Sequence, residues 1–123
     1  MNSIMSERSI EFDTVLDLCR DRHRRIVLAV LANHQRSLTL NDLTKTIVKH
    51  NHHLSVTAVS GDELSQIRLS LYHEHIPALE AASVIDYDSD RELVEPTERF
   101  DELVPRLSAI IEADPELEPP VEL

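Results

Sequence analysis

The sequence predicts a small, mainly α-helical domain with one short β-hairpin, and three observations lead to this fold class. Only four of the 123 residues are Phe or Tyr and none is Trp, so the core must consist of Leu, Ile, Val and Ala, which favours packed helices. A single glycine, Gly61, argues against an all-β fold, because its tight turns need positive φ repeatedly. Finally, apolar residues recur at helical spacing over most of the chain.

The first helical pattern extends from Phe12 to His34. Its apolar residues fall three or four positions apart, but the polar run at 21–25 interrupts them, so the sequence predicts one helix or two abutting helices. The apolar residues of this pattern are Phe12, Val15, Leu16, Cys19, Ile26, Val27, Val30 and Leu31. The segment that follows, 33–40, is predicted to be a loop.

A second helix is predicted after this loop, with Thr39 or Asn41 as its N-cap, because their side chains accept hydrogen bonds from the first backbone N–H groups of a helix. Its apolar residues are Leu40, Leu43, Ile47 and Val48. The next segment, 50–62, is predicted to be a connection in which Ser60 and Asp62 are candidate caps for a third helix.

The third helix is predicted to extend from about Glu63 to about Ala82. Pro77 lies within it and removes one N–H group, so a kink or a break is expected there. On a helical wheel the residues that face the core are Leu64, Ile67, Leu69, Leu71, Tyr72, Ile76 and Leu79, and His75 also points inward. The outward arc holds Gln66, Ser70, His73, Pro77 and Glu80.

Residues 84–96 break the helical pattern. The β-forming residues at 84–87 precede the turn-forming sequence at 88–91, and Leu93 and Val94 begin a return strand. The sequence therefore predicts a short hairpin here.

A closing helix at 98–113 follows, which Thr97 can cap. Its apolar stripe continues despite Pro105 and consists of Phe100, Leu103, Val104, Leu107, Ile110 and Ile111. Three helices, a hairpin and a closing helix are the element order of a winged helix-turn-helix domain. The predicted organisation is a flexible N-terminus at 1–10, a winged-helix domain at 11–97, a C-terminal helix for dimerisation at 98–113 and an acidic disordered tail at 114–123.

The net charge of −11 is unevenly distributed, since residues 1–56 carry +2 and residues 57–123 carry −13. Only two of the twelve basic residues are Lys, and this composition resembles that of proteins from extreme halophiles. Molar salt would screen repulsion between these acids and DNA phosphates. No apolar run approaches the ~20 residues of a membrane span, no signal peptide is recognised and Cys19 is the single cysteine, so a cytoplasmic protein is expected.

The stretch LSLYHEHIPALEAASVIDYD at 69–88, with ELVEP after it, resembles a haloarchaeal winged-helix family found in many uncharacterised proteins and regulators. More distantly, HIPALEAASVI at 75–85 is similar to a segment of ArsR-like transcriptional repressors, with Ile76 in place of Leu and Ser83 in place of Gly. Because Ser enters the left-handed conformation less readily than Gly, the third helix is expected to end in another way.

The resemblance implies that Ser70, His73 and Glu74 face the DNA groove, and the helical wheel adds Gln66 and Pro77. Gln pairs with adenine, whereas Ser and His reach bases or phosphates. The expected function is therefore that of a transcriptional regulator that binds double-stranded DNA with its helix at 63–82 in the major groove. Candidate phosphate contacts are Lys45, Lys49 and, in the wing, Arg91. The basic run adds Arg22, Arg24 and Arg25, which contact phosphate or a second subunit, or form an ordinary solvated face.

A homodimer is expected, formed by the first helix and by the stripe from Phe100 to Ile111, because this stripe exceeds what a three-helix core needs. The alternative function is a winged-helix module that binds another protein with its acidic wing and does not bind DNA. The acidic residues of the wing are Asp86, Asp88, Asp90, Glu92 and Glu95.

Seven histidines raise the question of a metal site. His50, His52 and His53 cluster, but no carboxylate or Cys stands beside them at a recognised ligand spacing. His73 and His75 are two positions apart on a helix and point away from each other. No metal site and no cofactor are expected. The chain also contains no motif for nucleophilic or phosphate chemistry, so no catalytic residues are expected and the protein is not expected to be an enzyme.

Overall fold

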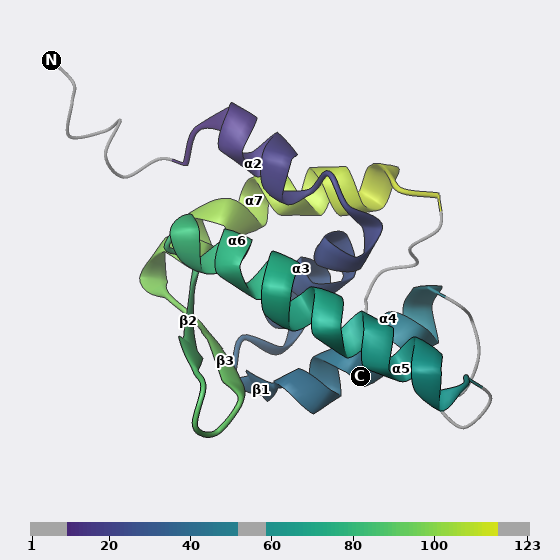
Figure 1. The fold of residues 1–123 in the computed structure, drawn as a ribbon. Coiled ribbons are helices and arrows are strands. Elements are labelled where there is room, and N and C mark those ends of the chain that lie inside the picture. The colour runs from purple at the N-terminus through teal and green to yellow at the C-terminus, as the bar shows by residue number, and fades with distance from the viewer. Residues whose placement is uncertain (1–9, 52–58, 116–123) are drawn as a thin grey trace, which may run out of the picture.

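The computed structural model describes residues 10–51 and 59–115, which form five helical runs and a three-stranded antiparallel sheet (Figure 1). The predicted fold class is confirmed: the fold is mainly α and resembles a winged helix. The elements are α2 (Phe12–Leu18), α3 (Arg22–His34), β1 (Leu38–Thr39), α4 (Leu40–Asn51), α5 (Gly61–Ser70), the π-helical turn η2 (Leu71–His75), α6 (Ile76–Ala81), β2 (Ile85–Asp88), β3 (Leu93–Pro96) and α7 (Glu98–Ala113). No helix among the described residues has the length and apolar character of a membrane span.

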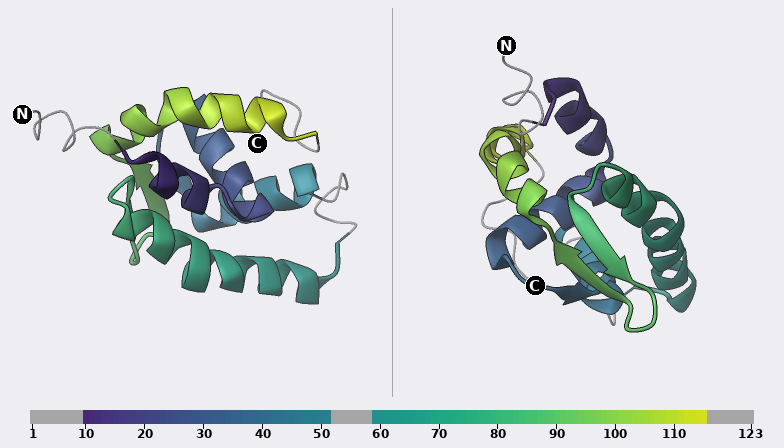
Figure 2. Two further views of the ribbon diagram at one scale, coloured as in Figure 1. Left: turned by 90° about the horizontal axis from the view of Figure 1, so that it is seen from above. Right: turned by 90° about the vertical axis from the view of Figure 1, so that its left-hand side faces the viewer.

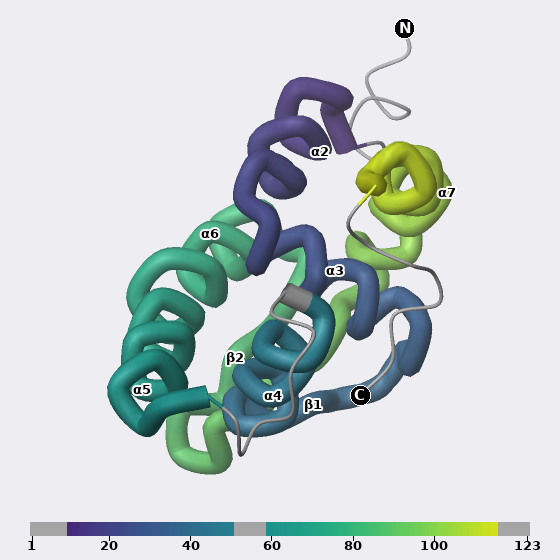
Figure 3. Tube along the Cα trace, turned by 90° about the vertical axis from the view of Figure 1, so that its right-hand side faces the viewer, coloured from purple at the N-terminus to yellow at the C-terminus, as the bar shows by residue number. Residues whose placement is uncertain are grey.

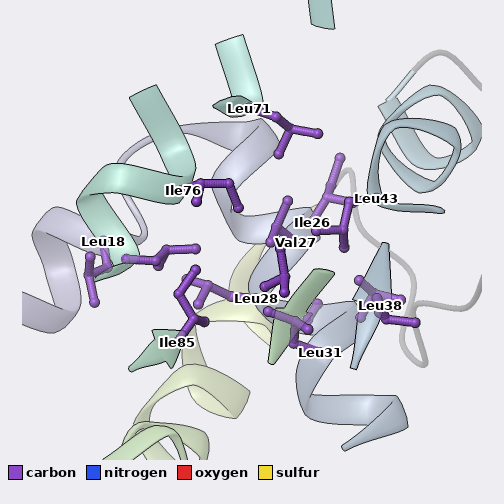
Figure 4. Close-up of a cluster of buried hydrophobic side chains, with 14 of the residues drawn as sticks. Leu18, Ile26, Val27, Leu28, Leu31, Leu38, Leu43, Leu71, Ile76 and Ile85 are labelled. Carbon is purple, nitrogen blue, oxygen red and sulfur yellow. The ribbon is translucent and has the colours of Figure 1, made fainter. Parts of the chain in front are cut away.

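Helix α3 forms the centre of the core. Asp21 caps it, since its carboxylate accepts hydrogen bonds from the backbone N–H groups of His23 and Arg24, which explains why the first helical pattern divides into α2 and α3. Every residue from 26 to 31 is buried, so α3 is covered on all sides. In Figure 4 its side chains meet Leu71 and Ile76 from one neighbouring run and Leu38 and Leu43 from another.

The helices lie in layers around α3. In both views of Figure 2, α7 lies on one side of α3 and α4, and the continuous run α5–η2–α6 lies on the other. The hairpin of β2 and β3 extends beside this run, as the wing of a winged helix does. The run at 61–81 is therefore exposed along the side that faces away from α7, where a recognition helix would have to lie.

Strand β1 was not predicted, because the segment 33–40 was expected to be a loop. Leu38 pairs with Val94 and Thr39 with Leu93, which gives the strand order β1-β3-β2. The loop prediction is wrong because a two-residue strand leaves no periodicity in the sequence and depends on a partner strand far along the chain. Thr39 is nevertheless a helix cap as predicted: its Oγ1 accepts from the N–H of Asp42, whose carboxylate accepts from the N–H of Thr39.

The third helical run contains a π-helical turn at the site where Pro77 was expected to cause a kink or a break. The N–H of Ile76 donates to the carbonyl of Leu71, five residues earlier, and Pro77 then lies in the first turn of α6, where its missing N–H costs little. The helical run continues through this turn instead of breaking.

The π turn accommodates one more residue than an α-helical turn, and this changes which residues face the core. Ile67, Leu71, Ile76 and Leu79 are buried as expected, but Leu69 and Tyr72 are 59% and 45% exposed. The wheel assumed a constant advance of about 100° per residue, and a π turn changes the phase by inserting one residue. Two large apolar side chains therefore lie at the surface of the run.

The third helix ends in a Schellman motif, contrary to the expectation drawn from Ser83. The N–H of Val84 donates to the carbonyl of Leu79 at 3.2 Å, and the N–H of Ser83 donates to that of Glu80 at 2.9 Å. Ser83 adopts a φ of 64°, in the left-handed region. The bonds of this motif and the following strand hold Ser83 in a conformation that favours glycine.

Replacing Ser83 by glycine is expected to stabilise the domain by about 0.5–1 kcal/mol, because relief of the left-handed strain exceeds the entropy that glycine adds to the unfolded chain. Urea denaturation would measure the change. The matched control is Ser108→Gly on the exposed side of α7, where the same replacement should destabilise the helix by a few tenths of a kcal/mol. A destabilised Ser83→Gly protein would contradict the left-handed assignment.

Helix α7 closes the domain from the side opposite the exposed run (Figure 3). Most of the apolar stripe expected to form a dimer packs inside the chain: Phe100, Leu103, Leu107 and Ile111 belong to the core, and Val104 and Ile110 are half-buried against it. Ile10, placed in the flexible N-terminus by the sequence, is also buried in this core. Asp114, placed in the disordered tail, accepts a hydrogen bond from Arg25 at 3.0 Å. Residues 1–9 and 116–123 lie outside the described part of the chain.

Candidate nucleic-acid interface

The outward side of the run α5–η2–α6 carries the residues predicted to face DNA. Gln66, His73, Glu74 and Pro77 are exposed, and Ser70 is half-buried. Ser60 starts this run, because its hydroxyl accepts a hydrogen bond from the N–H of Glu63, so the first exposed turn is well fixed. These residues form a mainly polar surface on a rigid element.

Contacts with the wing hold one edge of this surface. Arg68 of α5 forms an ion pair with Glu92 at 2.6 Å, and the ring of Tyr72 meets that of Tyr87 edge-on at 6.1 Å between centroids. Burial, and then the carboxylate of Glu92, raise the pKa of Tyr87. A groove of about 380 Å³ lies between the run and the wing, lined by residues that include Leu69 and both tyrosines. The wing and the helix thus form one continuous surface.

Arg91, the predicted phosphate contact of the wing, is engaged within the hairpin. Its guanidinium donates to the carboxylate of Asp88 at 2.9 Å, and the backbone N–H groups of Arg91 and Asp90 also donate to Asp88. The hydrogen bonds from Arg91 lower the pKa of Asp88. The ion pair is exposed, so Arg91 can exchange Asp88 for another anion at small cost.

The surface formed by the helical run and the wing is acidic. Residues 61–96 contain nine acidic and two basic side chains, and both basic side chains, Arg68 and Arg91, are paired with carboxylates of the wing. Attraction between this surface and phosphates therefore cannot come from an excess of positive charge. The more basic part of the neighbourhood is α4, which packs against α5 and exposes Lys45 and Lys49 one turn apart.

The basic run at the start of α3 divides into three environments. Arg22 is exposed, as a phosphate or subunit contact requires. Arg25 is half-buried and donates to Asp114 and to the carbonyl of Cys19, so it ties the end of α7 to the start of α3. Arg24 is only 7% exposed, which excludes it from phosphate or subunit contacts in this conformation. The prediction for Arg24 was wrong because, within the polar run at 21–25, the side chain of Arg24 is buried.

Arg24 is buried because it belongs to a polar network with His75 and Asp21. Its Nε donates to Nδ1 of His75 at 3.4 Å, its Nη1 donates to the carbonyl of Asp17 at 3.3 Å, and Nε2 of His75 lies 3.6 Å from the carboxylate of Asp21. The network joins the start of α3 to the π turn. The inward orientation that the wheel gave for His75 is confirmed.

The pKa values in this network follow from burial and neighbouring charges. Burial has the largest effect and lowers the pKa of His75; Asp21 opposes this less strongly, and Arg24 lowers the pKa further. Burial alone would raise the pKa of Asp21, but His75 and the backbone N–H groups that donate to Asp21 lower it overall. A neutral imidazole between a guanidinium and a carboxylate is therefore the favoured state.

Asp21, His23 and His75 also place three possible metal ligand atoms within 4.8 Å of one another. The chemistry around them does not favour a cation. A histidine that binds metal through one ring nitrogen donates from the other, whereas Nδ1 of His75 accepts from Arg24. The positive end of α3 and the guanidinium add repulsion. Of the His cluster at 50–53, only His50 lies within the described residues, at the end of α4.

Sequence reasoning missed the exposure of Leu69 and Tyr72 and the pairing of Arg68 with the wing. The apolar side chains were assigned to the core by a wheel that could not include the π turn. Pro77 was the available sequence signal, since a proline inside a helix marks a place where regular geometry is disturbed, but it does not specify which residues then change face.

A comparison with protein families identifies a match for this chain. The profile of a family described as a domain of unknown function (DUF7344) matches residues 16–95, from within α2 to β3. The matched range thus includes the central helix, the exposed helical run and the wing. No curated protein and no solved structure matches the chain.

Proposed function

The chain belongs to the DUF7344 family, described only as a domain of unknown function, and we propose from its geometry that it is a DNA-binding transcriptional regulator. In this proposal the run α5–η2–α6 enters the major groove of double-stranded DNA. The role is one of binding rather than catalysis.

One observation carries the proposal: the winged-helix arrangement leaves a long helical run exposed beside the hairpin, with Gln66 and His73 on its outward side. An α-helix fits the major groove, and Gln and His can donate to base edges there. Lys45, Lys49 and Arg22 are the exposed basic residues proposed to contact phosphates near this helix.

The acidic surface sets the conditions under which such binding can occur. At ~2 M salt the Debye length is below about 3 Å, so repulsion between the carboxylates and phosphates is largely screened. Screening also removes most of the gain from counterion release. Affinity must then come from hydrogen bonds, close packing and DNA shape, which suits a chain whose composition resembles that of halophilic proteins.

A homodimer remains part of the proposal, but only one of the two expected surfaces is kept, the first helix. Most of the α7 stripe is buried in the core, whereas Phe12 and Leu16 lie one turn apart and are exposed on α2, away from the run proposed to read DNA. Helix α2 lies on the α7 side of the domain, so pairing there would leave the exposed run free.

A second candidate function is favoured by the charge of the same surface. The acidic wing and the nearby groove are suited to a basic partner protein, because residues 61–96 contain nine acidic and only two basic side chains. Electrostatic complementarity of this kind is strongest at low salt. The two functions therefore differ in their salt dependence, which an experiment can exploit.

The test of DNA binding is retention of genomic DNA fragments at ~2 M KCl, where screening is nearly complete. We expect the protein to retain a sequence-selective subset, and a Gln66/Ser70/His73→Ala variant to lose about tenfold or more in affinity, because each bidentate base contact alone can supply that factor. A matched Glu98→Ala variant, exposed at the start of α7, should bind as the unchanged protein does.

The outcomes separate the two functions. Selective retention that the triple variant loses supports the DNA-reading role of α5–η2–α6. If the unchanged protein retains no DNA at any salt concentration but captures a basic protein at low salt, the DNA proposal is wrong and the second candidate replaces it. Equal retention by the triple variant would exclude this helix as the reading element.

A further inference from the structure

Two large apolar side chains are exposed on the element proposed to read DNA. Leu69 and Tyr72 lie in consecutive turns, 59% and 45% exposed, and both line the groove of about 380 Å³ beside the wing. The edge-on contact with Tyr87 supports the ring of Tyr72. These side chains form an apolar surface whose position follows from the π turn and which the described residues leave exposed.

The surroundings restrict what can cover this surface. The neighbouring guanidinium of Arg68 is held by Glu92, so the site offers apolar contact and hydrogen bonding but little net positive charge. Gln66 stands one turn before Leu69 on the same exposed side of α5. An amide that can pair with adenine thus stands beside an apolar side chain.

This combination matches the major-groove edge of an A·T base pair. Adenine presents N6 and N7, which Gln recognises, and thymine presents a methyl group, which apolar side chains contact. No other base pair of DNA carries a methyl group in the groove. Contact with a methyl group is also insensitive to the screening of charges by salt.

We propose that Leu69 and Tyr72 contact thymine methyl groups, so that the DNA recognised is rich in A·T pairs at the positions that α5 and η2 read. This inference rests on the proposed DNA-binding function and names its ligand chemistry. Such contacts would supply affinity without positive charge, in keeping with the few basic side chains on this surface.

The test compares two preparations of the same genomic fragments, one amplified with dTTP and one with dUTP. The dUTP preparation has the same sequences but carries uracil, which lacks the methyl group of thymine. At ~2 M KCl the unchanged protein is expected to bind the uracil DNA about 4-fold to 15-fold more weakly, since each buried methyl group contributes about fourfold. Leu69→Ala and Tyr72→Ala should each bind thymine DNA several-fold more weakly and discriminate less between the two preparations.

Two control variants make the result specific. Glu98→Ala changes an exposed side chain at the start of α7 and should leave both affinity and discrimination unchanged. Gln66→Ala should weaken binding to both preparations and keep the preference for thymine. Because Leu69 and Tyr72 are exposed, their variants should fold, and circular dichroism would check this.

The outcomes distinguish this inference from the function on which it rests. If the unchanged protein binds thymine and uracil DNA equally, the methyl contact is wrong and the DNA-binding function stands. If Leu69→Ala and Tyr72→Ala keep full discrimination, the contact lies elsewhere and the assignment of these two residues is wrong. If the unchanged protein retains neither preparation, the proposed function fails and this inference fails with it.

Discussion

Leu107→Glu is expected to unfold the domain, and this is the largest effect that the structure predicts for a single substitution. Leu107 lies on the buried side of α7, is 1% exposed and packs in the core. The substitution removes about 2–3 kcal/mol of apolar burial and adds the cost of a carboxylate without a partner, so the loss exceeds about 4–5 kcal/mol. A small domain has about 5–15 kcal/mol of stability in total.

Circular dichroism and thermal denaturation would measure this effect, and light scattering would report the assembly state. The matched control is Ser108→Glu, one residue later on the exposed side of α7, which should leave the melting temperature nearly unchanged. If α7 instead formed a dimer interface, Leu107→Glu would give folded monomers. A cooperative transition with full helical content in the variant would therefore contradict the packing of α7.

The second large effect concerns Arg24, which the sequence placed at the surface. Arg24→Ala is expected to cost about 2–4 kcal/mol of stability, because it leaves a cavity and removes the donor to His75 and to the carbonyl of Asp17. Urea denaturation would measure the change. The control is Arg22→Ala, where the side chain is exposed and the expected change is below about 0.5 kcal/mol.

The same pair of variants separates a structural role from a DNA-contacting one. A phosphate contact at position 24 would leave stability unchanged and lower DNA affinity at every sequence. The structure predicts the opposite for Arg24, with a loss of stability that the Arg22 variant does not share. A fully stable Arg24→Ala protein would show that this side chain is not held in the network with His75.

The parts of the fold that could be predicted from the sequence are those fixed by local patterns. Helix α4 follows from its apolar spacing and the Thr39 cap, and the wing follows from β-forming residues on both sides of a turn. Strand β1 could not be predicted, since Leu38 becomes a strand residue only by pairing with Val94, which no local signal encodes. The bounds of the closing helix were predicted, but the sequence did not indicate that most of its apolar stripe packs against the core.

The candidate site was predictable to a similar degree. The outward positions of Gln66 and His73 follow from the wheel, and both side chains are exposed, although His73 lies within the π turn. The burial of Arg24 depends on His75, 51 positions away, and a run of like charges gives no indication that one member has a distant buried partner. The pairing of Arg68 with Glu92 likewise depends on where the wing packs.

The π turn sets how the two parts of the helical run are rotated about their common axis. Leu64 and Ile67 before the turn and Ile76 and Leu79 after it share one core, although their spacing along the chain is not that of a single straight α-helix. If residues 71–75 became α-helical with no residue removed, α5 would rotate by roughly 100° about the helix axis relative to α6. Leu69 would then turn inward and part of the present core face would turn outward. The one added residue of the π turn thus determines which side of α5 faces the core and which side faces solvent.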